Sequence, residues 1–427
     1  MTEFSFKKSD LNIESLGKAK YESHLSQGFV KDSQRVLLKS NHDESRGAIC
    51  TDGMLSFEKA GPREKLFFDS KDLVCGIVTC GGLCPGLNDV IRAVTLSLLW
   101  EYKAKKVLGF RYGYRGVSST AFVPPIELTP EVVSEIQHEG GTILGSSRGP
   151  QDAADIAEIL QKYNVKVLFV IGGDGTFRGA HELSEYIEEN KLGISIVGIP
   201  KTIDNDIYCS ERTFGFSTAV EEAQRAICSA HKESRAAWNG IGIVKLMGRD
   251  SGFIAAAATL ANSDVNFCLI PEVPFSLEGE DGILSKIKER LEEKRHLVIV
   301  VAEGAGQHLM SKVHETDLSG NRRYRDIGLF LKAEIREYYR KLGEPVTIKF
   351  IDPSYMIRSC PANADDSSFC LMLSQHAVHA AMAGKTDMFV GYWHNSFVHV
   401  PLNIAARKKK QLNLNTDLWR AVKEIMD

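Results

Sequence analysis

The sequence has no apolar run long enough to span a bilayer, and its first residues, Met1 to Lys8, are polar and of mixed charge. These absences argue against a membrane-spanning protein and a secretory signal peptide. Its last residues, Glu424 to Asp427, carry no peroxisomal tripeptide. The formal net charge of the 427 residues is only −3. Neither a nucleic acid nor a membrane surface is therefore expected as a partner.

Cysteine is sparse, and the nine cysteines do not form a metal-binding pattern. Cys80 and Cys84 lack the C-x2-C spacing of a zinc site, and no second pair follows, so we interpret them as structural. The 12 histidines show no H-E-x-x-H spacing. Four cysteines lie in apolar runs, namely Cys75, Cys80, Cys268 and Cys370. Buried, reduced thiols of this kind are typical of a cytoplasmic protein.

With 43% hydrophobic and 25% charged residues, the composition is ordinary for a soluble protein of two domains. Residues 1 to about 72 alternate in charge, and we interpret them as an N-terminal extension that packs on a core domain or a neighbouring subunit. From Val74 a pattern of strand, glycine loop and helix repeats. The predicted strands are Leu73–Thr79, Lys105–Phe110, Val165–Ile171, Ile194–Ile199, Ile241–Leu246, Val265–Ile270, Leu297–Val301, Val346–Ile351 and Asp387–Gly391. The predicted helices are Asp152–Tyr163, Thr218–His231, Glu280–Lys294, Ile327–Arg340 and Asp365–Met382.

Most of these strands are continuous apolar runs, as in a parallel sheet covered on both faces. The alternation with helices predicts an α/β fold of two doubly wound (Rossmann-like) domains plus the extension. In such folds, ligands bind beyond the carboxyl ends of the strands, where the glycine loops of this sequence lie.

Two glycine loops could bind phosphate. The loop Thr79 to Asn88 follows a strand and opens a helix. Its glycines would let backbone amides approach a phosphate, but a tight strand-to-helix turn needs glycine equally. In the loop Gly140 to Pro150, Arg148 stands among small residues that cannot pair with it. We favour phosphate binding over a solvated arginine, because a guanidinium fits two phosphate oxygens at once.

The loop Gly172 to Thr176 presents Asp174 at a strand tip. An aspartate there can hold a Mg²⁺ ion that bridges phosphates. The alternative is that Asp174 or Thr176 caps a helix, although a cap does not need a glycine on both sides.

The loop Lys201 to Asp206 follows the next apolar run, about thirty residues later, as in a βαβ unit. If the segment is extended, Asp204 and Asp206 point the same way, so that one could accept a proton and the other orient a metal. The alternative is an Asx turn with solvated acids. Lys201 argues against it, because a lysine beside the acids suits a transferring phosphoryl group. Together the loops predict phosphoryl transfer onto a hydroxyl.

Three further segments could bind the acceptor. Arg249, in the loop Lys245 to Gly252, could clamp the phosphoryl group or the acceptor, and Glu303 could accept hydrogen bonds from sugar hydroxyls. The segment Lys349 to Arg358 gathers cations and a tyrosine, as an anionic acceptor requires. The run Arg407 to Lys410 is interpreted as a solvated face, the alternative being an effector-phosphate site.

In this order the motifs resemble the 6-phosphofructokinase family, from about Val74 to the C-terminus. The resemblance rests on Gly81-Gly82 with Pro85 to Asn88, Gly172 to Gly175, Thr202 to Asp206, Met247 to Arg249, and Arg358. The element 172–176 alone is shared with NAD kinases and lipid kinases, but those lack a role for the later motifs. Residues 214–220, 245–253 and 351–358 look most like the branch with plant, spirochaete and trypanosomatid enzymes, although a glycosomal tail is absent.

The resemblance implies transfer of the ATP γ-phosphoryl group, assisted by Mg²⁺, to the 1-hydroxyl of fructose 6-phosphate, a step of glycolysis. Asp204 would be the base, with Lys201, Thr202 and Arg249 as further catalytic residues. The implied nucleotide contacts are Gly81, Arg148, Gly149, Gly173, Asp174, Gly175 and Thr176, with Asp174 also holding the metal. The implied contacts of fructose 6-phosphate are Thr202, Ile203, Asp204, Met247, Gly248, Arg249, Glu303, Lys349, Tyr355, Met356, Ile357 and Arg358.

The resemblance also implies a domain division and an oligomer. The expected parts are an N-terminal extension (1–72), a nucleotide-binding domain (73–215 and 357–408) and a sugar-phosphate-binding domain (216–356 and 409–427). An allosteric homo-oligomer of four subunits is expected. Gly240 stands where the common bacterial enzymes place an arginine that reaches a neighbour's substrate, Tyr355 where they have histidine, and Lys349 where they have arginine. The first departure puts their cross-subunit contact in doubt here.

The phosphoryl donor could be ATP or pyrophosphate. In the family, an aspartate in place of Gly175 goes with pyrophosphate use, because it occupies the space of the nucleotide's α-phosphate. Lys201 is typical of the pyrophosphate enzymes, although ATP-using enzymes of this branch combine the lysine with the glycine. We predict ATP, because an obstruction excludes ATP whereas an extra cation helps either donor. A regulatory subunit that does not turn over is a further alternative, but Asp174, Asp204 and Arg249 complete the catalytic set.

Overall fold

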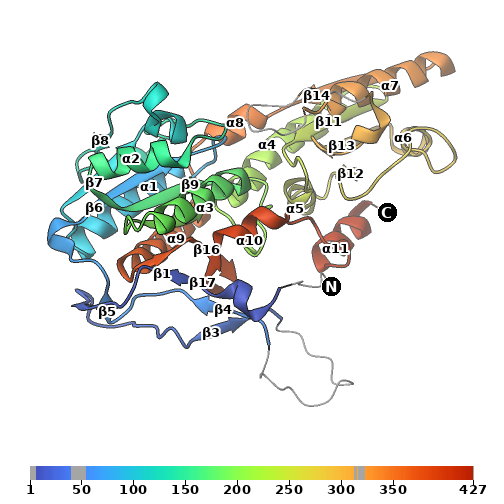
Figure 1. Cartoon of the computed structure of the whole chain (residues 1–427). Coiled ribbons are helices and arrows are strands. Elements are labelled where there is room, and N and C mark those ends of the chain that lie inside the picture. The colour runs from blue at the N-terminus through green and yellow to red at the C-terminus, as the bar shows by residue number, and fades with distance from the viewer. Residues whose placement is uncertain (1–5, 40–53, 312–314, 316–322, 427) are drawn as a thin grey trace, which may run out of the picture. The chain divides into compact units, whose positions relative to one another are not determined.

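The structure is a computed structural model that describes residues 6–39, 54–311, 315 and 323–426. The chain divides into two compact units (Figure 1). Unit 1 comprises residues 1–202, 207–215 and 360–409, and unit 2 comprises residues 203–206, 216–359 and 410–427. Parts of the predicted extension, 1–5 and 40–53, lie outside the described residues.

Unit 1 is built on a nine-stranded sheet with the order β3-β4-β17-β16-β10-β9-β6-β7-β8. The central strands β16, β10, β9, β6 and β7 are parallel, and antiparallel strands close both edges. The strand bounds are β3 Arg35–Leu37, β4 Ser56–Lys59, β6 Val74–Thr79, β7 Lys106–Phe110, β8 Ile126–Glu127, β9 Val165–Gly172, β10 Ser195–Pro200, β16 Met388–Trp393 and β17 Ser396–Pro401. Every residue of β6 and β10 is buried, because helices cover both faces of the sheet.

The helices of unit 1 form two packed groups. Helices α1 and α9 pack together, and α3 packs with α2 and α10. Their bounds are α1 Leu87–Leu96, α2 Ala153–Lys162, α3 Asp174–Glu189, α9 Ala364–Met382 and α10 Leu402–Arg407. In register, Thr79 lies opposite Ile171, and Gly172 lies opposite Pro200. Strands β6, β9 and β10 therefore end level, so the loops that follow them meet at one edge.

Unit 2 contains a smaller, four-stranded parallel sheet with the order β12-β13-β11-β14. Its strands are β11 Gly240–Leu246, β12 Phe267–Leu269, β13 His296–Ala302 and β14 Thr347–Ile351. Its helices are α4 Phe216–Arg235, α5 Phe253–Ala261, α6 Ile283–Lys294, α7 Ile327–Leu342, α8 Ser354–Ser359 and α11 Asp417–Met426. Leu246 pairs with Ala302, so β11 and β13 also end level.

The N-terminal extension is an integral part of unit 1. Strands β3 and β4 lengthen the nine-stranded sheet at the β17 edge. Strand β1 (Glu14–Ser15) pairs with β15 (Lys385–Thr386), and β2 (Tyr21–Glu22) pairs with β5 (Lys65–Leu66). Leu11 and Phe57 are fully buried. The extension thus packs on the core of unit 1 through both backbone pairing and apolar contacts.

The predicted fold class, two doubly wound α/β units, is confirmed by these sheets and helices. Some predicted bounds were wrong. Asp387 has a φ of +52°, so β16 begins at Met388, and α6 begins only after Gly282. Strand β12 keeps only three residues of the predicted run 265–270. Among the described residues, no helix combines the length and the apolar character needed to cross a membrane.

Candidate active site

Lys201 joins three loops of unit 1. Its backbone N–H donates to the carbonyl oxygen of Gly172 over 2.9 Å. Its side-chain Nζ donates to the carbonyl oxygen of Gly82 over 2.7 Å, and the residue is only 6% exposed. The Lys201 side chain therefore ties the loop after β6 to the loop after β10, and its backbone N–H ties the latter to the end of β9.

The loop that contains Arg148 lies against the first glycine loop. Gly81 donates its N–H to the carbonyl oxygen of Ser147, and Ser146 Oγ donates to the carbonyl oxygen of Gly81 over 2.7 Å. A Cβ atom added at Gly82 would lie 3.2 Å from Nη2 of Arg148. Gly81 adopts a φ of +88°, which favours glycine. The structure thus brings two cations, Arg148 and Lys201, to the glycine loop after β6, an arrangement that suits phosphate.

Asp174 is the first residue of α3, directly after the N-cap Gly173. Its Oδ1 accepts a hydrogen bond from the N–H of Gly175 over 2.8 Å, and its side chain is 40% exposed. The capping alternative was wrong, since Gly173 occupies the cap and neither Asp174 nor Thr176 does. A Cβ atom at Gly175 would meet nothing within 4 Å. The space that the sequence predicts beside Asp174 is therefore open in unit 1.

A lysine that the sequence analysis assigned to a solvated face lies beside Asp174. Lys409 Nζ is 3.8 Å from Oδ2 of Asp174. Its neighbours are also engaged, because Arg407 pairs with Asp10 and Lys408 lies over the ring of Tyr208. No sequence signal points to this pairing, since residues 174 and 409 are far apart in the chain.

The donor set at Asp174 suits a magnesium ion that is shared with a phosphate chain. In the part of the chain that the structure describes, no group of three His, Cys, Asp or Glu side chains could hold a metal ion. Magnesium is commonly held by one or two carboxylates, with water and substrate phosphates as its other ligands. A single carboxylate at the start of a helix, beside a phosphate-binding loop, fits that pattern.

In unit 2, the segment from Ile203 to Asp206 is a turn, and Asn205 has a φ of +54°. The segment is therefore not extended, so strand alternation does not align Asp204 with Asp206. Backbone contacts fix the turn instead: Ser251 Oγ donates to the carbonyl oxygen of Asp204 (3.3 Å), and Lys410 N–H donates to that of Asp206 (2.9 Å). On the unit 1 side, the carbonyl oxygen of Thr202 accepts from Thr213 Oγ1 over 2.7 Å.

The loops after β11 and β13 interlock at the carboxyl edge of the second sheet. Glu303 N–H donates to the carbonyl oxygen of Leu246, and Gly304 N–H donates to that of Gly248. Gly248 has a φ of +121°, and a Cβ atom at Gly304 would clash with the carbonyl oxygen of Arg249. These glycines allow the close approach that brings Arg249 and Glu303 together.

Cations surround the buried carboxyl group of Glu303. Burial raises the pKa of Glu303, while the positive charges of Arg249, Arg358 and Lys245 act in the opposite direction. The guanidinium carbon of Arg249 also lies 4.8 Å from the ring centre of Tyr324. Lys245 begins the motif Lys245 to Gly252, but the sequence alone assigned it no role.

Lys245 is held by two carboxylates. Its Nζ lies 2.5 Å from Asp326 Oδ2 and 2.8 Å from Asp352 Oδ2. Burial lowers the pKa of Lys245, but these two partners outweigh burial, and the pKa is raised overall. Asp326 caps α7, and Asp352 accepts from the backbone and side chain of Ser354 at the start of α8. Lys245 thus connects β11 to the helix that carries Arg358.

The remaining predicted acceptor residues differ in position. On α8, Tyr355 and Met356 are 80% and 76% exposed, and the Arg358 guanidinium lies 5.0 Å from the Tyr355 ring centre. Met247 and Ile357 are 4% and 1% exposed, so both residues are buried within unit 2. Lys349 pairs with Glu233 at 3.0 Å and lies opposite Gly242, early in β11. Within unit 2, the structure therefore does not bring Lys349 to the carboxyl edge.

Comparisons with known proteins agree with this arrangement. The sequence profile of the family described as Phosphofructokinase matches residues 74–381. The chain is 46% identical over 428 residues to the ATP-dependent 6-phosphofructokinase of Borreliella burgdorferi, a match that covers 97% of this chain and 95% of that protein. It is 47% identical over 371 residues to the ATP-dependent 6-phosphofructokinase of Trypanosoma cruzi, covering 86% of this chain and 76% of that protein.

Among solved structures, the chain resembles a pyrophosphate-dependent phosphofructokinase from Marinobacter aquaeolei, with a TM-score of 0.69 and 19% identity, over 83% of this chain and 90% of that one. At this identity the likeness supports the fold alone. The profile match begins at β6 and ends in α9. It contains every loop of the candidate site, and only Lys409 lies beyond its end. The chain belongs to the phosphofructokinase family.

Proposed function

We propose that the chain is an ATP-dependent 6-phosphofructokinase of glycolysis. It transfers the γ-phosphoryl group of ATP to the 1-hydroxyl of fructose 6-phosphate, giving fructose 1,6-bisphosphate and ADP. The observation that carries this proposal is the loop cluster of unit 1, in which Lys201 joins the glycine loops beside Asp174 and the open space at Gly175. Near full-length relatives that are ATP-dependent 6-phosphofructokinases agree with it. In the part of the chain that the structure describes, the buried cysteines form no disulfide, which suits the reducing cytoplasm.

Unit 1 would bind the nucleotide. Arg148 and the glycine loop would hold the phosphates by bidentate and backbone hydrogen bonds. Lys201 would stabilise the charge that develops on the transferring group. Asp174 would hold Mg²⁺, which neutralises charge on the phosphate chain when it is bound. Lys409 would exchange its contact with Asp174 for a nucleotide phosphate.

Unit 2 would bind the sugar phosphate. Asp204 would take the proton from the 1-hydroxyl as that oxygen attacks the γ-phosphorus, while Arg249 stabilises the phosphoryl oxygens. Glu303 would accept hydrogen bonds from sugar hydroxyls, and Arg358 would hold the 6-phosphate. Lys245 would be a positioning residue, because it fixes the start of the helix that carries Arg358.

Pyrophosphate is the alternative donor, and Lys201 is the feature that favours it. Pyrophosphate, which is smaller than ATP, would fit the same cations. However, a Cβ atom at Gly175 meets nothing within 4 Å in unit 1, so nothing there obstructs the nucleotide. An open position admits the α-phosphate of ATP, so we propose ATP as the donor.

Replacement of Asp204 by Asn tests the mechanism. We expect kcat to fall by roughly two to four decades, the usual contribution of a general base, while nucleotide binding persists. Asp206→Asn is the matched control, because it removes the neighbouring carboxylate from the same turn, and we expect it to keep most of kcat. If Asp204→Asn kept near-normal kcat at saturating substrates, or if Asp206→Asn were the inactive variant, the assignment of the base would fail.

We also propose that the protein is a homo-oligomer of four subunits. Unit 2 exposes large apolar side chains that an interface would cover, including Trp238 (63% exposed), Leu329 (52%) and Met356 (76%). Sedimentation velocity at assay concentrations tests this proposal, and a monomer that turns over at the full rate would contradict it.

A further inference from the structure

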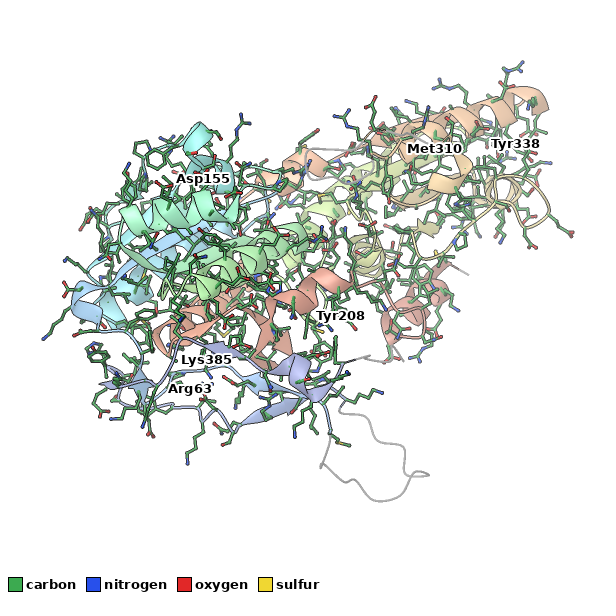
Figure 2. The ribbon with its side chains drawn as sticks, viewed as in Figure 1. Arg63, Asp155, Tyr208, Met310, Tyr338 and Lys385 are labelled. Carbon is green, nitrogen blue, oxygen red and sulfur yellow. The ribbon has the colours of Figure 1, made fainter. Side chains whose placement is uncertain are left out.

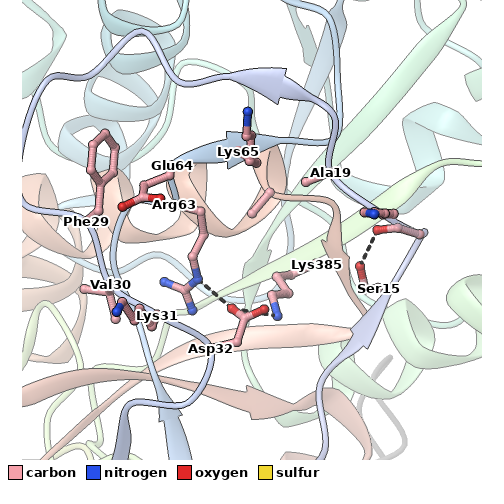
Figure 3. Close-up of a pocket in the computed structure, with 13 residues that line it drawn as sticks. Ser15, Ala19, Phe29, Val30, Lys31, Asp32, Arg63, Glu64, Lys65 and Lys385 are labelled. Atoms are coloured by element: carbon pink, nitrogen blue, oxygen red, sulfur yellow. Dashed lines mark hydrogen bonds and ion pairs between the residues drawn. The ribbon is translucent and has the colours of Figure 1, made fainter.

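Unit 1 has a cavity beneath the N-terminal extension. Its volume is about 480 Å³, in the range of sites for small molecules. Three stretches of the extension line it, within 15–19, 29–32 and 63–65, together with Ala383 and Lys385 (Figure 3). None of the residues assigned above to nucleotide or sugar lines this cavity.

Basic side chains outnumber acidic ones in the lining of the cavity, although Lys65 pairs with Glu22 and the whole chain has a net charge of −3. Five of its side chains are basic, and only Asp32 and Glu64 are acidic. The basic residues are Lys18, Lys31, Arg63, Lys65 and Lys385. An excess of positive charge inside a concave site attracts anions.

Two buried cations form the floor of the cavity. The side chains of Arg63 and Lys385 are each 9% exposed. Both contact the carboxylate of Asp32, Arg63 through Nε at 2.7 Å and Lys385 through Nζ at 3.3 Å. Figure 2 marks the two cations, one from the extension and the other from β15, and Figure 3 shows them directed at Asp32.

Asp32 is the replaceable partner of these cations. Its side chain is 64% exposed, whereas Glu58, which contacts the same two cations at 2.9 and 3.1 Å, is 7% exposed. If Asp32 moved away, the floor would keep two cations and one fixed carboxylate. An anion from solution could then take the position of the Asp32 carboxylate.

Arg63 and Lys385 would not need to change position when an anion binds. Besides its ion pairs, Arg63 donates to the carbonyl oxygens of Gly61 (2.8 Å) and Lys59 (3.2 Å). The carbonyl oxygen of Lys385 accepts from Ser195 Oγ over 2.7 Å, and β15 pairs with β1. Binding at a preorganised floor costs little ordering entropy.

The mouth of the cavity adds further cations and an apolar wall. Lys18 and Lys31 are exposed, and neither has an ion-pair partner in the part of the chain that the structure describes. Phe29 and Val30 are partly buried and line one side. The combination suits an anion that carries a compact apolar group.

We propose that this cavity binds a small phosphate monoester with an apolar or aromatic organic group. The phosphate replaces the Asp32 carboxylate at Arg63 and Lys385, and the organic group lies against Phe29 and Val30. A phosphate dianion brings more charge and more acceptor oxygens to the two cations than a carboxylate does, so it competes successfully with Asp32.

Calorimetric titration of the full chain with phenyl phosphate and with inorganic phosphate tests this proposal. Asp32→Asn removes the competing carboxylate, and we expect it to tighten phenyl phosphate binding roughly tenfold, the worth of one charge-assisted contact. Lys31→Ala should weaken binding several-fold. Lys20→Ala is the matched control, because Lys20 is an exposed lysine of the same segment that does not line the cavity. Binding to Lys20→Ala should equal that of the unmodified chain.

The variants also separate this site from the nucleotide and sugar sites, since none of them alters a residue assigned to catalysis. Equal affinity in all variants would mean that phenyl phosphate binds elsewhere and would overturn the proposal, as would the absence of saturable binding. Tighter binding of inorganic phosphate than of phenyl phosphate would overturn the role of Phe29 and Val30. Arg63 is left intact, because its contacts with Asp32, Glu58, Lys59 and Gly61 hold parts of the extension together. The result does not depend on whether the chain is a kinase.

Discussion

The side-chain nitrogen of Lys409 lies 3.8 Å from a carboxylate oxygen of Asp174, at the start of α3. This pairing gives the proposed metal-binding carboxylate a cation in the absence of nucleotide. A Mg²⁺ ion that arrived with a phosphate chain would take over the carboxylate and leave Lys409 beside the phosphates. Lys409 is therefore expected to contribute to nucleotide binding.

Lys409→Ala is predicted to raise the KM for ATP about tenfold and to change kcat much less, because one charge-assisted contact to phosphate is lost. Lys408→Ala is the matched control, since the Lys408 side chain lies over the ring of Tyr208 instead of near Asp174. Steady-state kinetics with varied ATP measure both variants. Equal KM values for the two would show that Lys409 does not meet the nucleotide.

Gly175→Asp is predicted to lower kcat/KM for ATP by roughly two decades or more, because a like charge beside the α-phosphate costs several kcal/mol. The fold should persist, since a side chain at this position meets nothing within 4 Å. Gly175→Ala separates bulk from charge and should retain most ATP-dependent activity. An Asp variant with unchanged kcat/KM and unchanged melting temperature would mean that the nucleotide does not pass Gly175.

Arg249 and Arg358 are predicted to affect different kinetic constants. Arg249 acts on the transferring group, so Arg249→Ala should lower kcat. Arg358 holds the 6-phosphate, so Arg358→Ala should mainly raise the KM for fructose 6-phosphate, by roughly tenfold or more. Steady-state kinetics of both variants at varied fructose 6-phosphate concentration measure kcat and KM separately. An unchanged KM for fructose 6-phosphate in the Arg358→Ala variant would show that Arg358 does not hold the 6-phosphate.

The buried histidines of α9 predict a loss of stability in acid. Burial lowers the pKa of His376 to about 3 and that of His379 to about 4. Below pH 6.5 the unfolded chain binds protons that the folded chain does not, so stability is full above this pH and falls as the pH drops. Each histidine contributes about 1.4 kcal/mol per pH unit to the fall.

The variant His376→Phe should reduce this pH dependence, because it removes one titrating group and can keep the stacking on Phe397. His138→Gln, at an exposed site, should leave the dependence unchanged. The free energy of unfolding between pH 7.5 and 5 measures both. Parallel curves for His376→Phe and the unmodified chain would show that His376 binds its proton in the folded state.

Much of the fold could be predicted because a parallel sheet imposes a simple pattern on the sequence. Strands β6, β9 and β10 are buried on both faces, so their sequences are nearly uninterrupted apolar runs. The glycines between strand and helix mark the loops of unit 1. The short strands β3 and β4 had no such signal, because β4 pairs with β17, more than three hundred residues later, and β3 pairs only with β4.

The candidate site was predicted where its chemistry is local and missed where it depends on long-range contacts. Asp174 and Arg148 stand in glycine loops that any reader of the sequence can find. Lys409 reaches Asp174 only through the folding of the C-terminal segment onto unit 1. At Asp204 the sequence left both an extended segment and an Asx turn open, because Asn205 takes a left-handed conformation that asparagine tolerates but does not require.

The most direct test of the account is a coupled assay of the purified chain with fructose 6-phosphate and Mg²⁺, offering ATP and pyrophosphate separately. The open position at Gly175 predicts turnover with ATP that exceeds any turnover with pyrophosphate. Turnover with pyrophosphate but not with ATP would contradict the account and show that Lys201, not Gly175, determines the phosphoryl donor.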